Sequence, residues 1–234
     1  MAFEGFPTAA LDFYAGVAAH NDPVWFEAHR EAYDGAVVAP SQAFIEALGQ
    51  RLQALRPEVG YSPNHTGRGS FKKIHTDRRF NPDRPPFKTY AQMIFWEGPL
   101  AQKKANSVFK VHFEPGKVVV GAGLWYFDGK LLKAYRAAVA DDATGAPLQA
   151  LVDALAAKGY AIGHSHYQRV PRGYAADHPR AGLLKHDGLF ARFTASPPPA
   201  AFHRADFVDW ALDHCEALAP LHGWCVDFLE GASR

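Results

Sequence analysis

The chain has 234 residues, enough for one large domain or two small ones. Its composition, 48% hydrophobic and 13% aromatic, excludes a disordered chain, and the presence of only two cysteines excludes a disulfide scaffold or a four-cysteine zinc site. The net charge of +1 excludes a whole-protein attraction to nucleic acid or anionic lipid. No segment has the roughly 20 apolar residues that span a bilayer. We therefore expect a soluble, cytoplasmic protein in which any attraction to a polyanion is local.

The first 57 residues are predicted to be helical. Apolar residues at helical spacing begin after Pro7 and continue to about His20. Asn21 or Asp22 can cap a second helix whose first position is Pro23, where a missing N–H costs nothing. A third apolar stripe begins around the next proline, at position 40, and stops at position 57.

Alternating large apolar residues replace the helical spacing after this point. Candidate strands span residues 70–75, 87–96, 108–113 and 117–127, and a Pro-Gly turn joins the last two into an antiparallel hairpin. Helical spacing returns at 131–139 and 147–157, followed by a short helix after Asp177, a strand at 189–194 and a last helix from about 205 to 229. Pro220 should kink or split that last helix.

Helices, then strands, then helices, without regular alternation, predict an α+β fold. The sheet should be mainly antiparallel, with about four to six strands and with the N-terminal and C-terminal helices packed on it. We expect one domain over residues 1–234, because no repeat or long linker divides the chain. Its parts are helical over 1–57, strands over 68–127, and helices plus one strand over 128–234.

Positive charge is concentrated between residues 68 and 110, where there are ten basic and three acidic residues. The densest part contains Arg78, Arg79 and Lys88 and is stiffened by three prolines. A stiff loop loses little entropy when guanidinium forks and a lysine bind a carboxylate or phosphate. The alternative is that Asp77 and Asp83 pair with the arginines, so that the basic cluster only serves the fold.

Several short segments carry a resemblance to a known family. They are Trp25-Phe26, Arg78-Arg79-Phe80 with Asp83, Pro86-Phe87-Lys88, Gly121-Ala122-Gly123, and Arg169-Val170-Pro171-Arg172-Gly173-Tyr174 with Asp177-His178-Pro179. In order and spacing, over almost the whole chain, they resemble the bacterial and fungal family known as domain of unknown function 2461. Asp77, Arg79 and Phe80 fit that family's Arg-Asp-x-Arg-Phe pattern. The resemblance implies a single, soluble α+β domain and brings no established activity with it.

A second candidate site follows Arg169. Asp177 precedes His178, a proline and two leucines, which is typical of a helix N-cap. His178 at a helix start could act as an acid, a base or an anion donor, with Arg169 and Tyr174 near it in sequence. Asp83 is a further candidate for acid–base chemistry.

Gly121 and Gly123 interrupt a predicted strand, where glycine usually marks a bulge or a close approach by backbone, ring or ligand. They do not form a dinucleotide fingerprint, since no third glycine and no helix follow. His164 and His166 would face the same way on a strand, but two imidazoles do not make a metal site, and we expect neither a metal nor a cofactor.

The residues favour binding of a small anionic ligand, bearing phosphate or carboxylate, by Arg79, Lys88 and Arg169, with Arg78, Tyr174, Gly121 and Gly123 as further contacts. His178 or Asp83 would act if the protein is an enzyme. A nucleic-acid-binding module that uses the 68–110 patch is the alternative, since aromatic residues alternate with the basic ones there. A third hypothesis assigns the basic residues to the fold alone. The oligomeric state does not follow from the sequence.

Overall fold

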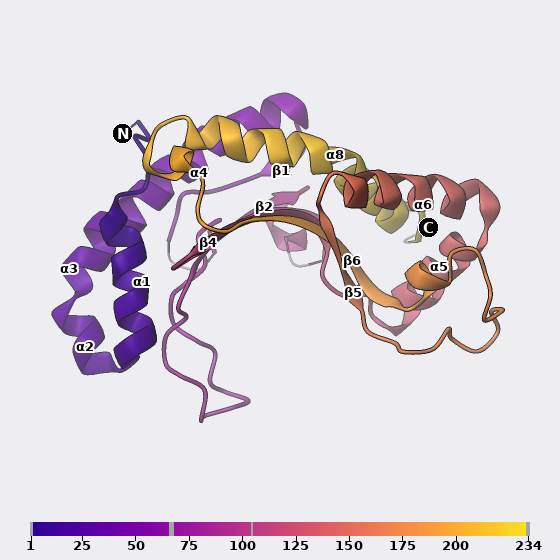
Figure 1. The fold of residues 1–234 in the computed structure, drawn as a ribbon, viewed down its shortest axis with the longest axis horizontal. Coiled ribbons are helices and arrows are strands. Elements are labelled where there is room, and N and C mark those ends of the chain that lie inside the picture. Colours follow the sequence, from indigo (N-terminus) through magenta and orange to yellow (C-terminus); the bar gives the residue numbers. More distant parts are fainter. Residues whose placement is uncertain (1, 66–67, 104, 233–234) are drawn as a thin grey trace. The chain divides into compact units, whose positions relative to one another are not determined.

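The computed structural model describes residues 2–65, 68–103 and 105–232. Its helices are α1 (Thr8–His20), α2 (Pro23–Ala28), α3 (Arg30–Ala32), a π-helix η1 (Tyr33–Val38), α4 (Ala39–Leu55), α5 (Gly129–Ala140), α6 (Asp142–Ala157), α7 (Ala181–Leu184) and α8 (Phe207–Ala232), with short 3-10 turns η2 (Leu100–Gln102) and η3 (Ala200–His203). Its strands are β1 (Val59–Gly60), β2 (Ala91–Glu97), β3 (Val108–Glu114), β4 (Lys117–Leu124), β5 (Ala161–Ser165) and β6 (His186–Ala195). Figure 1 shows these elements along the chain.

The six strands form one antiparallel sheet in the order β1-β2-β3-β4-β6-β5. β5 pairs with β6 from Ala161 opposite Arg192 onward, with an irregularity between Gly163 and Ser165. Helices precede and follow the strands. The predicted α+β class with an antiparallel sheet is therefore confirmed.

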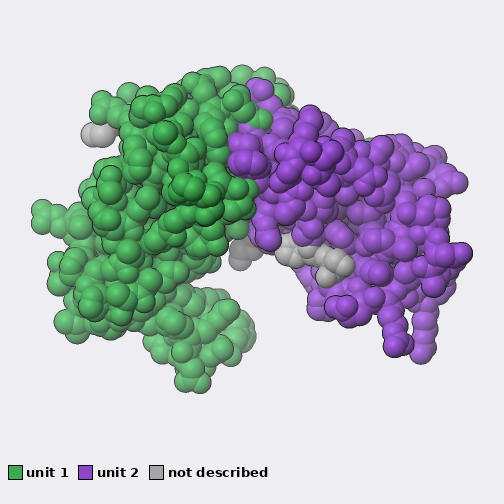
Figure 2. All heavy atoms as spheres, viewed as in Figure 1, with its two compact units in different colours: residues 1–96, 110–120, 194–213 green, residues 97–109, 121–193, 214–234 purple. Residues whose placement is uncertain are grey.

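The contacts within the chain define two compact units, which Figure 2 colours separately. Unit 1 comprises Met1–Trp96, Lys110–Val120 and Thr194–Asp213, and unit 2 comprises Glu97–Phe109, Gly121–Phe193 and His214–Arg234. The chain passes repeatedly from one unit to the other. That the whole chain is one folding domain stays a prediction.

The core of unit 1 is rich in phenylalanine. Phe6 is fully buried, with its ring stacked on Phe202 at 5.0 Å and tilted against Phe113 at 4.7 Å. Phe44 stacks on Phe207 at 5.2 Å, so helices α4 and α8 meet over the same cluster. Aromatic pairs at these distances add about 0.5–1.5 kcal/mol each to the free energy gained by burying their area.

The core of unit 2 places Phe127 against Tyr135, with ring centroids 4.4 Å apart and both side chains fully buried. The Tyr135 hydroxyl donates a hydrogen bond to the Leu183 carbonyl at 3.2 Å, which satisfies the one polar atom that this ring brings into the core. The same bond joins α5 to α7.

Local signals predicted the first helices well. α1 has the expected bounds, and the Asp22 carboxylate caps α2 by accepting from the Val24 and Trp25 amides, both at 2.9 Å. Pro23 occupies the first helical position. The third helix begins at Ala39, one residue before the predicted start.

Several strand boundaries were wrong. The stretch 70–75 makes only isolated bridges, Phe71 with Met93 and His75 with Phe87, because its pairing is too irregular for a continuous ladder. For the same reason β2 begins at Ala91 rather than at residue 87. β4 ends at Leu124, three residues early, and β1 and β5 were not predicted.

One prediction for a helix end fails, and of the two effects expected of Pro220, a kink or a split, the split does not occur. Asp177 does not cap α7, which begins at Ala181 after Arg180, because the preceding residues form a turn in which the Ala181 amide donates to the His178 carbonyl at 2.8 Å. α8 runs through Pro220 without being split. Buried Leu218 and Leu221 on either side hold the helix together where the proline removes one hydrogen bond.

Within the described ranges, no helix combines the length and hydropathy that crossing a membrane requires.

His112 on β3 gives unit 1 a dependence on pH. Its ring stacks on Tyr90 at 4.6 Å, and its Nε2 lies 3.4 Å from Glu114 Oε2. Burial, reinforced by Lys110, lowers the pKa of His112 to about 4, although Glu114 opposes this shift. Between pH 6.5 and 4 the unfolded chain therefore binds a proton that the folded chain does not, so stability falls as the pH falls.

We expect this group to reduce the free energy of unfolding by on the order of 2 kcal/mol as the pH falls from 7 to 4. The variant His112→Gln should lose correspondingly less over the same range. Urea denaturation of both proteins at pH 7, 5.5 and 4 measures the difference. Parallel pH profiles for the two proteins would contradict the prediction.

Candidate functional site

The basic loop, defined as residues 72–90, contains the segment 76–90, where the sequence has its densest positive charge. It belongs to unit 1 and carries six basic and two acidic side chains. Its two arms pair at their base, where the Thr76 amide donates to the Pro86 carbonyl and the Lys88 amide to the Ile74 carbonyl, both at 2.8 Å. Residues 77–85 form its tip, which has no regular structure. In Figure 1 the loop is the narrow two-armed segment, purple to magenta, that extends below the label of β4, and in the chain it follows β1 and precedes β2. Of the other basic residues expected in this patch, Lys104 lies outside the described residues.

Asn21 fixes the base of the basic loop to the helices. Its Nδ2 donates to the Phe87 carbonyl at 3.0 Å, and the Phe87 amide donates to Asn21 Oδ1 at 2.9 Å. The Phe87 ring stacks on Phe26 of α2 at 4.5 Å. Asn21 ends α1 in the left-handed conformation, with φ at +35°, which turns its amide group toward the loop. A side chain thus pairs with a backbone as a neighbouring strand would.

Asn21→Gly should destabilise the protein by about 1–2 kcal/mol, because it removes both hydrogen bonds while tolerating the backbone conformation. Asn21→Ala should cost about 1 kcal/mol more, since a Cβ disfavours the left-handed region. Chemical denaturation gives both energies, and hydrogen exchange at the Phe87 amide reports the loop directly. If that amide stays as protected in Asn21→Gly as in the parent, Asn21 does not hold the loop.

His75 lies at the base of the basic loop, where the charges of three cations act on its ring. The His75 ring lies edge-on to Phe26 and Phe87, at 5.9 and 5.2 Å. Burial, followed by the charges of Arg30, Lys73 and Lys88, lowers the pKa of His75, while Glu27 acts in the opposite direction. Glu27 is itself paired with Arg30. The cations therefore outnumber the acidic groups acting on this imidazole.

Lys88 is partly committed to the backbone. Its Nζ donates to the carbonyl of Lys73 and, at 3.1 Å, to that of His75. Burial, with a contribution from Lys72, lowers the pKa of Lys88. The ammonium thus holds the two arms of the loop base together while adding charge beside His75.

The tip pairs one of its arginines with an acid. Arg79 contacts both oxygens of Asp77, with Nε to Oδ1 at 3.0 Å and Nη2 to Oδ2 at 2.7 Å, which holds the pKa of Asp77 at about 2. Both side chains are exposed, so this ion pair contributes little to stability. Arg78 donates to the Pro82 carbonyl at 2.8 Å.

Two charged groups of the tip remain available. Among the described residues, neither the Asp83 carboxylate nor the Arg84 guanidinium has a hydrogen-bond or ion-pair partner. Internal pairing by acidic residues thus accounts for Arg79 but not for Arg84. Phe80, beside them, is 92% exposed, with the Arg79 guanidinium 5.7 Å from its ring centre.

The remaining sequence-predicted residues belong to unit 2, so the predicted set is divided between the units. Arg169 is exposed, and Tyr174 and His178 are half-buried in the turns before α7. His178 Nδ1 accepts from the Arg180 amide at 3.0 Å, so this nitrogen is an acceptor in the turn. Asp177 is exposed.

Gly121 and Gly123 are packed against strand β6. A Cβ on Gly121 would lie 2.4 Å from the Phe190 ring and 2.8 Å from the Ala191 carbonyl oxygen. Gly123, at φ +130°, would place a Cβ 2.2 Å from the Leu189 carbonyl oxygen. An aromatic ring and a neighbouring backbone make the close approaches that the sequence predicts at these positions.

Sequence reasoning missed Arg180, which joins helices α5 and α6. Its buried guanidinium donates from Nε to the Val139 carbonyl at 2.6 Å and from Nη2 to the Ala140 carbonyl at 3.0 Å, and it pairs with Asp142. These carbonyls end α5 and have no partner within that helix. Arg180 follows the Asp-His-Pro segment directly, which gives that segment a structural role.

A buried Ser-His-Glu network in unit 2 was also missed. Ser107 Oγ lies 2.8 Å from His222 Nδ1, and His222 Nε2 lies 2.9 Å from Glu97 Oε2. Phe109 stacks on the imidazole at 4.2 Å. Ser107 and His222 are fully buried, so the serine hydroxyl cannot meet a substrate in this conformation. The network links the end of β2, the residue before β3 and α8. Neither the order nor the spacing of its residues follows a motif of nucleophilic enzymes.

Cys215 and Cys225 are buried free thiols. Burial raises their pKa values well above the ordinary value, in Cys225 to about 12. Both are therefore protonated and unreactive near neutral pH.

The described residues contain no group of three or more side chains placed to hold a metal ion. The side chains of His164 and Ser165 lie outside what the structure describes. His166 Nδ1 lies 3.5 Å from Asp187 Oδ2.

These observations define an α+β protein with a basic loop clamped to its N-terminal helices. A family model described as a conserved hypothetical protein, DUF2461, matches residues 9–224. The chain therefore belongs to the DUF2461 family, which confirms the resemblance read from its short segments. No match is found among curated proteins or among solved structures.

Proposed function

We propose that the protein binds a small ligand bearing phosphate or carboxylate at the base of its basic loop. The observation that carries the proposal is the excess of cations around His75, where Arg30, Lys73 and Lys88 all act on one imidazole and Glu27 is the opposing acid. Uncompensated positive charge beside partly buried rings attracts an anion more strongly than the same charge in open water.

The loop base is held in one conformation before any ligand binds. Asn21 and the Phe26–Phe87 stack hold the loop base in place, so a ligand would not need to order it. Lys73 is exposed and has no ion-pair partner among the described residues. An oxyanion could accept from its ammonium and from a protonated His75 together.

The tip supplies further cations to the proposal. Arg79 can exchange its exposed contact with Asp77 for a ligand at little cost, and Arg84 is available. Arg169, Tyr174 and His178 stay proposed contacts of unit 2, with acid–base roles for His178 and Asp83 if a reaction occurs. We also propose a cytoplasmic location, which the two free thiols support.

The proposal predicts that sulfate, phosphate or citrate raises the melting temperature of the protein relative to chloride at equal ionic strength, because each stabilises the native state by mass action. Lys73→Ala and Arg79→Ala should reduce the shift, and the double variant should abolish it. Lys133→Ala, which removes an exposed lysine on α5 of unit 2, is the control. Equal shifts in the parent, the double variant and the control would contradict the proposal.

A nucleic-acid-binding function is the second candidate, and the exposure of Phe80 favours it. A phenylalanine that is 92% exposed buries almost none of its apolar area in the folded chain. Flanked by Arg79 and Arg84, its ring could stack on a base while the guanidinium groups contact phosphates. This function centres on Phe80 at the tip, whereas the small-ligand function centres on His75 and Lys73 at the base of the basic loop and uses Arg79 as a further contact.

Fluorescently labelled single-stranded oligonucleotides at low and moderate salt separate the two functions. A nucleic-acid module should bind with an affinity that falls steeply as salt rises, and Phe80→Ala should weaken it by about 1–3 kcal/mol while leaving the sulfate-induced thermal shift unchanged. If the oligonucleotides fail to bind even at low salt, the nucleic-acid function is excluded.

A further inference from the structure

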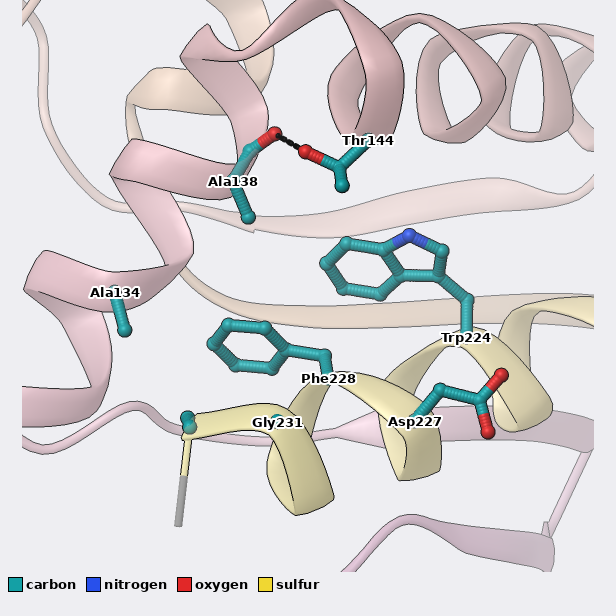
Figure 3. A pocket seen from close by; sticks show the side chains of 8 residues that line it. Ala134, Ala138, Thr144, Trp224, Asp227, Phe228 and Gly231 are labelled. Atoms are coloured by element: carbon teal, nitrogen blue, oxygen red, sulfur yellow. Dashed lines mark hydrogen bonds between the residues drawn. The ribbon is translucent and has the colours of Figure 1, made fainter. Parts of the chain in front are cut away.

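Unit 2 contains an apolar pocket of about 400 Å³ between α5 and the end of α8 (Figure 3). It is lined by Ala134, Ala138, Thr144, Trp224, Asp227, Phe228, Gly231 and Ala232. Pockets that take small organic molecules have about this volume and a mainly apolar lining. The proposed anion site is in unit 1 and involves none of these residues.

The aromatic side of the pocket is held in position. The Trp224 and Phe228 rings stack at 5.3 Å with an interplanar angle of 7°. The buried Tyr135 ring meets both of them edge-on, at 6.3 and 6.1 Å, and Phe127 meets Phe228 at 5.9 Å. These contacts preorganise two aromatic side chains that are themselves half-exposed.

The opposite side is lined by small residues. Ala134 and Ala138 are four residues apart and therefore share one face of α5, and Figure 3 shows both side chains directed toward the aromatic pair. Larger side chains at these positions would fill the space. The Thr144 hydroxyl donates to the Ala138 carbonyl at 2.6 Å, so its proton is not free for a ligand.

Among the described residues that line the pocket, Asp227 is the one with a charged side chain. Asp227 lies on the same helix as Trp224 and Phe228 and is exposed beside them (Figure 3). It has no hydrogen-bond or ion-pair partner within the described part of the chain. Aromatic faces and a free carboxylate both attract a cation, the first through the ring quadrupole and the second through its charge.

From this arrangement we infer that the pocket binds a small organic cation, an aromatic or aliphatic body bearing an ammonium group. The body lies between the alanines and the aromatic pair, and the ammonium lies toward Asp227. The apolar contact contributes most of the affinity, and the charge decides between ligands of the same shape.

Three probes of similar size and different charge test the inference: 2-phenylethylammonium, 2-phenylethanol and 3-phenylpropionate. Calorimetric or NMR titration of the intact protein should rank them in that order, with the cation about tenfold tighter than the anion. Asp227→Asn should reduce this preference to about twofold while leaving the affinity for 2-phenylethanol unchanged.

Ala138→Leu should weaken all three probes at least tenfold, because the larger side chain occupies the pocket. Ala137→Leu places the same side chain on an exposed neighbouring position of α5 and is the control. The inference is overturned if no probe binds, if 3-phenylpropionate binds as tightly as the cation, or if Ala138→Leu leaves binding unchanged. It is also overturned if the parent is a dimer that Ala138→Leu separates, since a second copy would then be the occupant.

Discussion

His222→Ala should destabilise the protein by about 3–5 kcal/mol, the largest effect expected of any single substitution considered for this chain. The imidazole is fully buried, stacks on Phe109 and hydrogen-bonds to Ser107 and Glu97. Its removal leaves a cavity and takes a partner from a buried carboxylate and from a buried hydroxyl at once. Both losses are expensive where water cannot replace the missing group.

Chemical denaturation of His222→Ala, Ser107→Ala and the double variant measures how far the network acts as a unit. Ser107→Ala alone should cost about 1–3 kcal/mol, and the double variant less than the sum, since both single variants remove the same Ser107–His222 hydrogen bond. His166→Ala, which removes an exposed histidine of the same unit, should change stability by less than about 0.5 kcal/mol. A loss below about 1 kcal/mol for His222→Ala would mean that the buried network is energetically neutral.

Gly121→Val is expected to cost about 3 kcal/mol through overpacking. A Cβ at this position would meet the Phe190 ring and the Ala191 carbonyl oxygen, both closer than 3.0 Å. A ring can turn aside, but a backbone oxygen within the sheet cannot move without disturbing the pairing of β4 with β6. A core substitution at this position should therefore destabilise the protein rather than impair ligand binding selectively.

The double variant Gly121→Val/Phe190→Leu should recover part of that loss, because it removes the ring and leaves only the backbone contact. Gly182→Ala is the matched control, since a Cβ there would meet nothing within 4 Å. Urea titrations give the four stabilities. If Gly121→Val is as stable as the parent, or if the double variant is no more stable than Gly121→Val, the Phe190 ring is not the reason for a glycine at this position.

The sequence predicted well those features that depend only on residues close together in the chain. The cap of α2 needs only Asp22 followed by Pro23, and the charge of the basic loop is a count of its own residues. The fold class followed from the order in which helical and alternating spacing of apolar residues occur along the chain. In contrast, the hydrogen bonds between the Asn21 side chain and the Phe87 backbone join residues that are 66 positions apart. Such a contact produces no periodic pattern in the sequence from which it could be predicted.

The predictions that failed depended on competition between local and distant contacts. Asp177 has the sequence signature of an N-cap. However, Arg180 donates hydrogen bonds to the carbonyls at the end of α5, 40 and 41 residues away. Helix α7 therefore begins after Arg180. His222 and Glu97 are 125 residues apart in the chain, so their pairing could not be inferred from spacing. The glycine positions were singled out correctly, whereas their neighbour, Phe190, was not identified.

The pKa of His75 in the presence of sulfate tests the proposed anion site most directly. The experiment is an NMR titration of the His75 ring between pH 4 and 8, in sulfate or in chloride at equal ionic strength. Sulfate is divalent over this whole range, whereas chloride is monovalent and binds weakly. A bound anion favours the imidazolium, so sulfate should raise the pKa of His75 by about 0.5 units or more, and leave that of exposed His166 unchanged. Equal pKa values for His75 in the two salts, or an equal rise at His166, would contradict anion binding at the base of the basic loop.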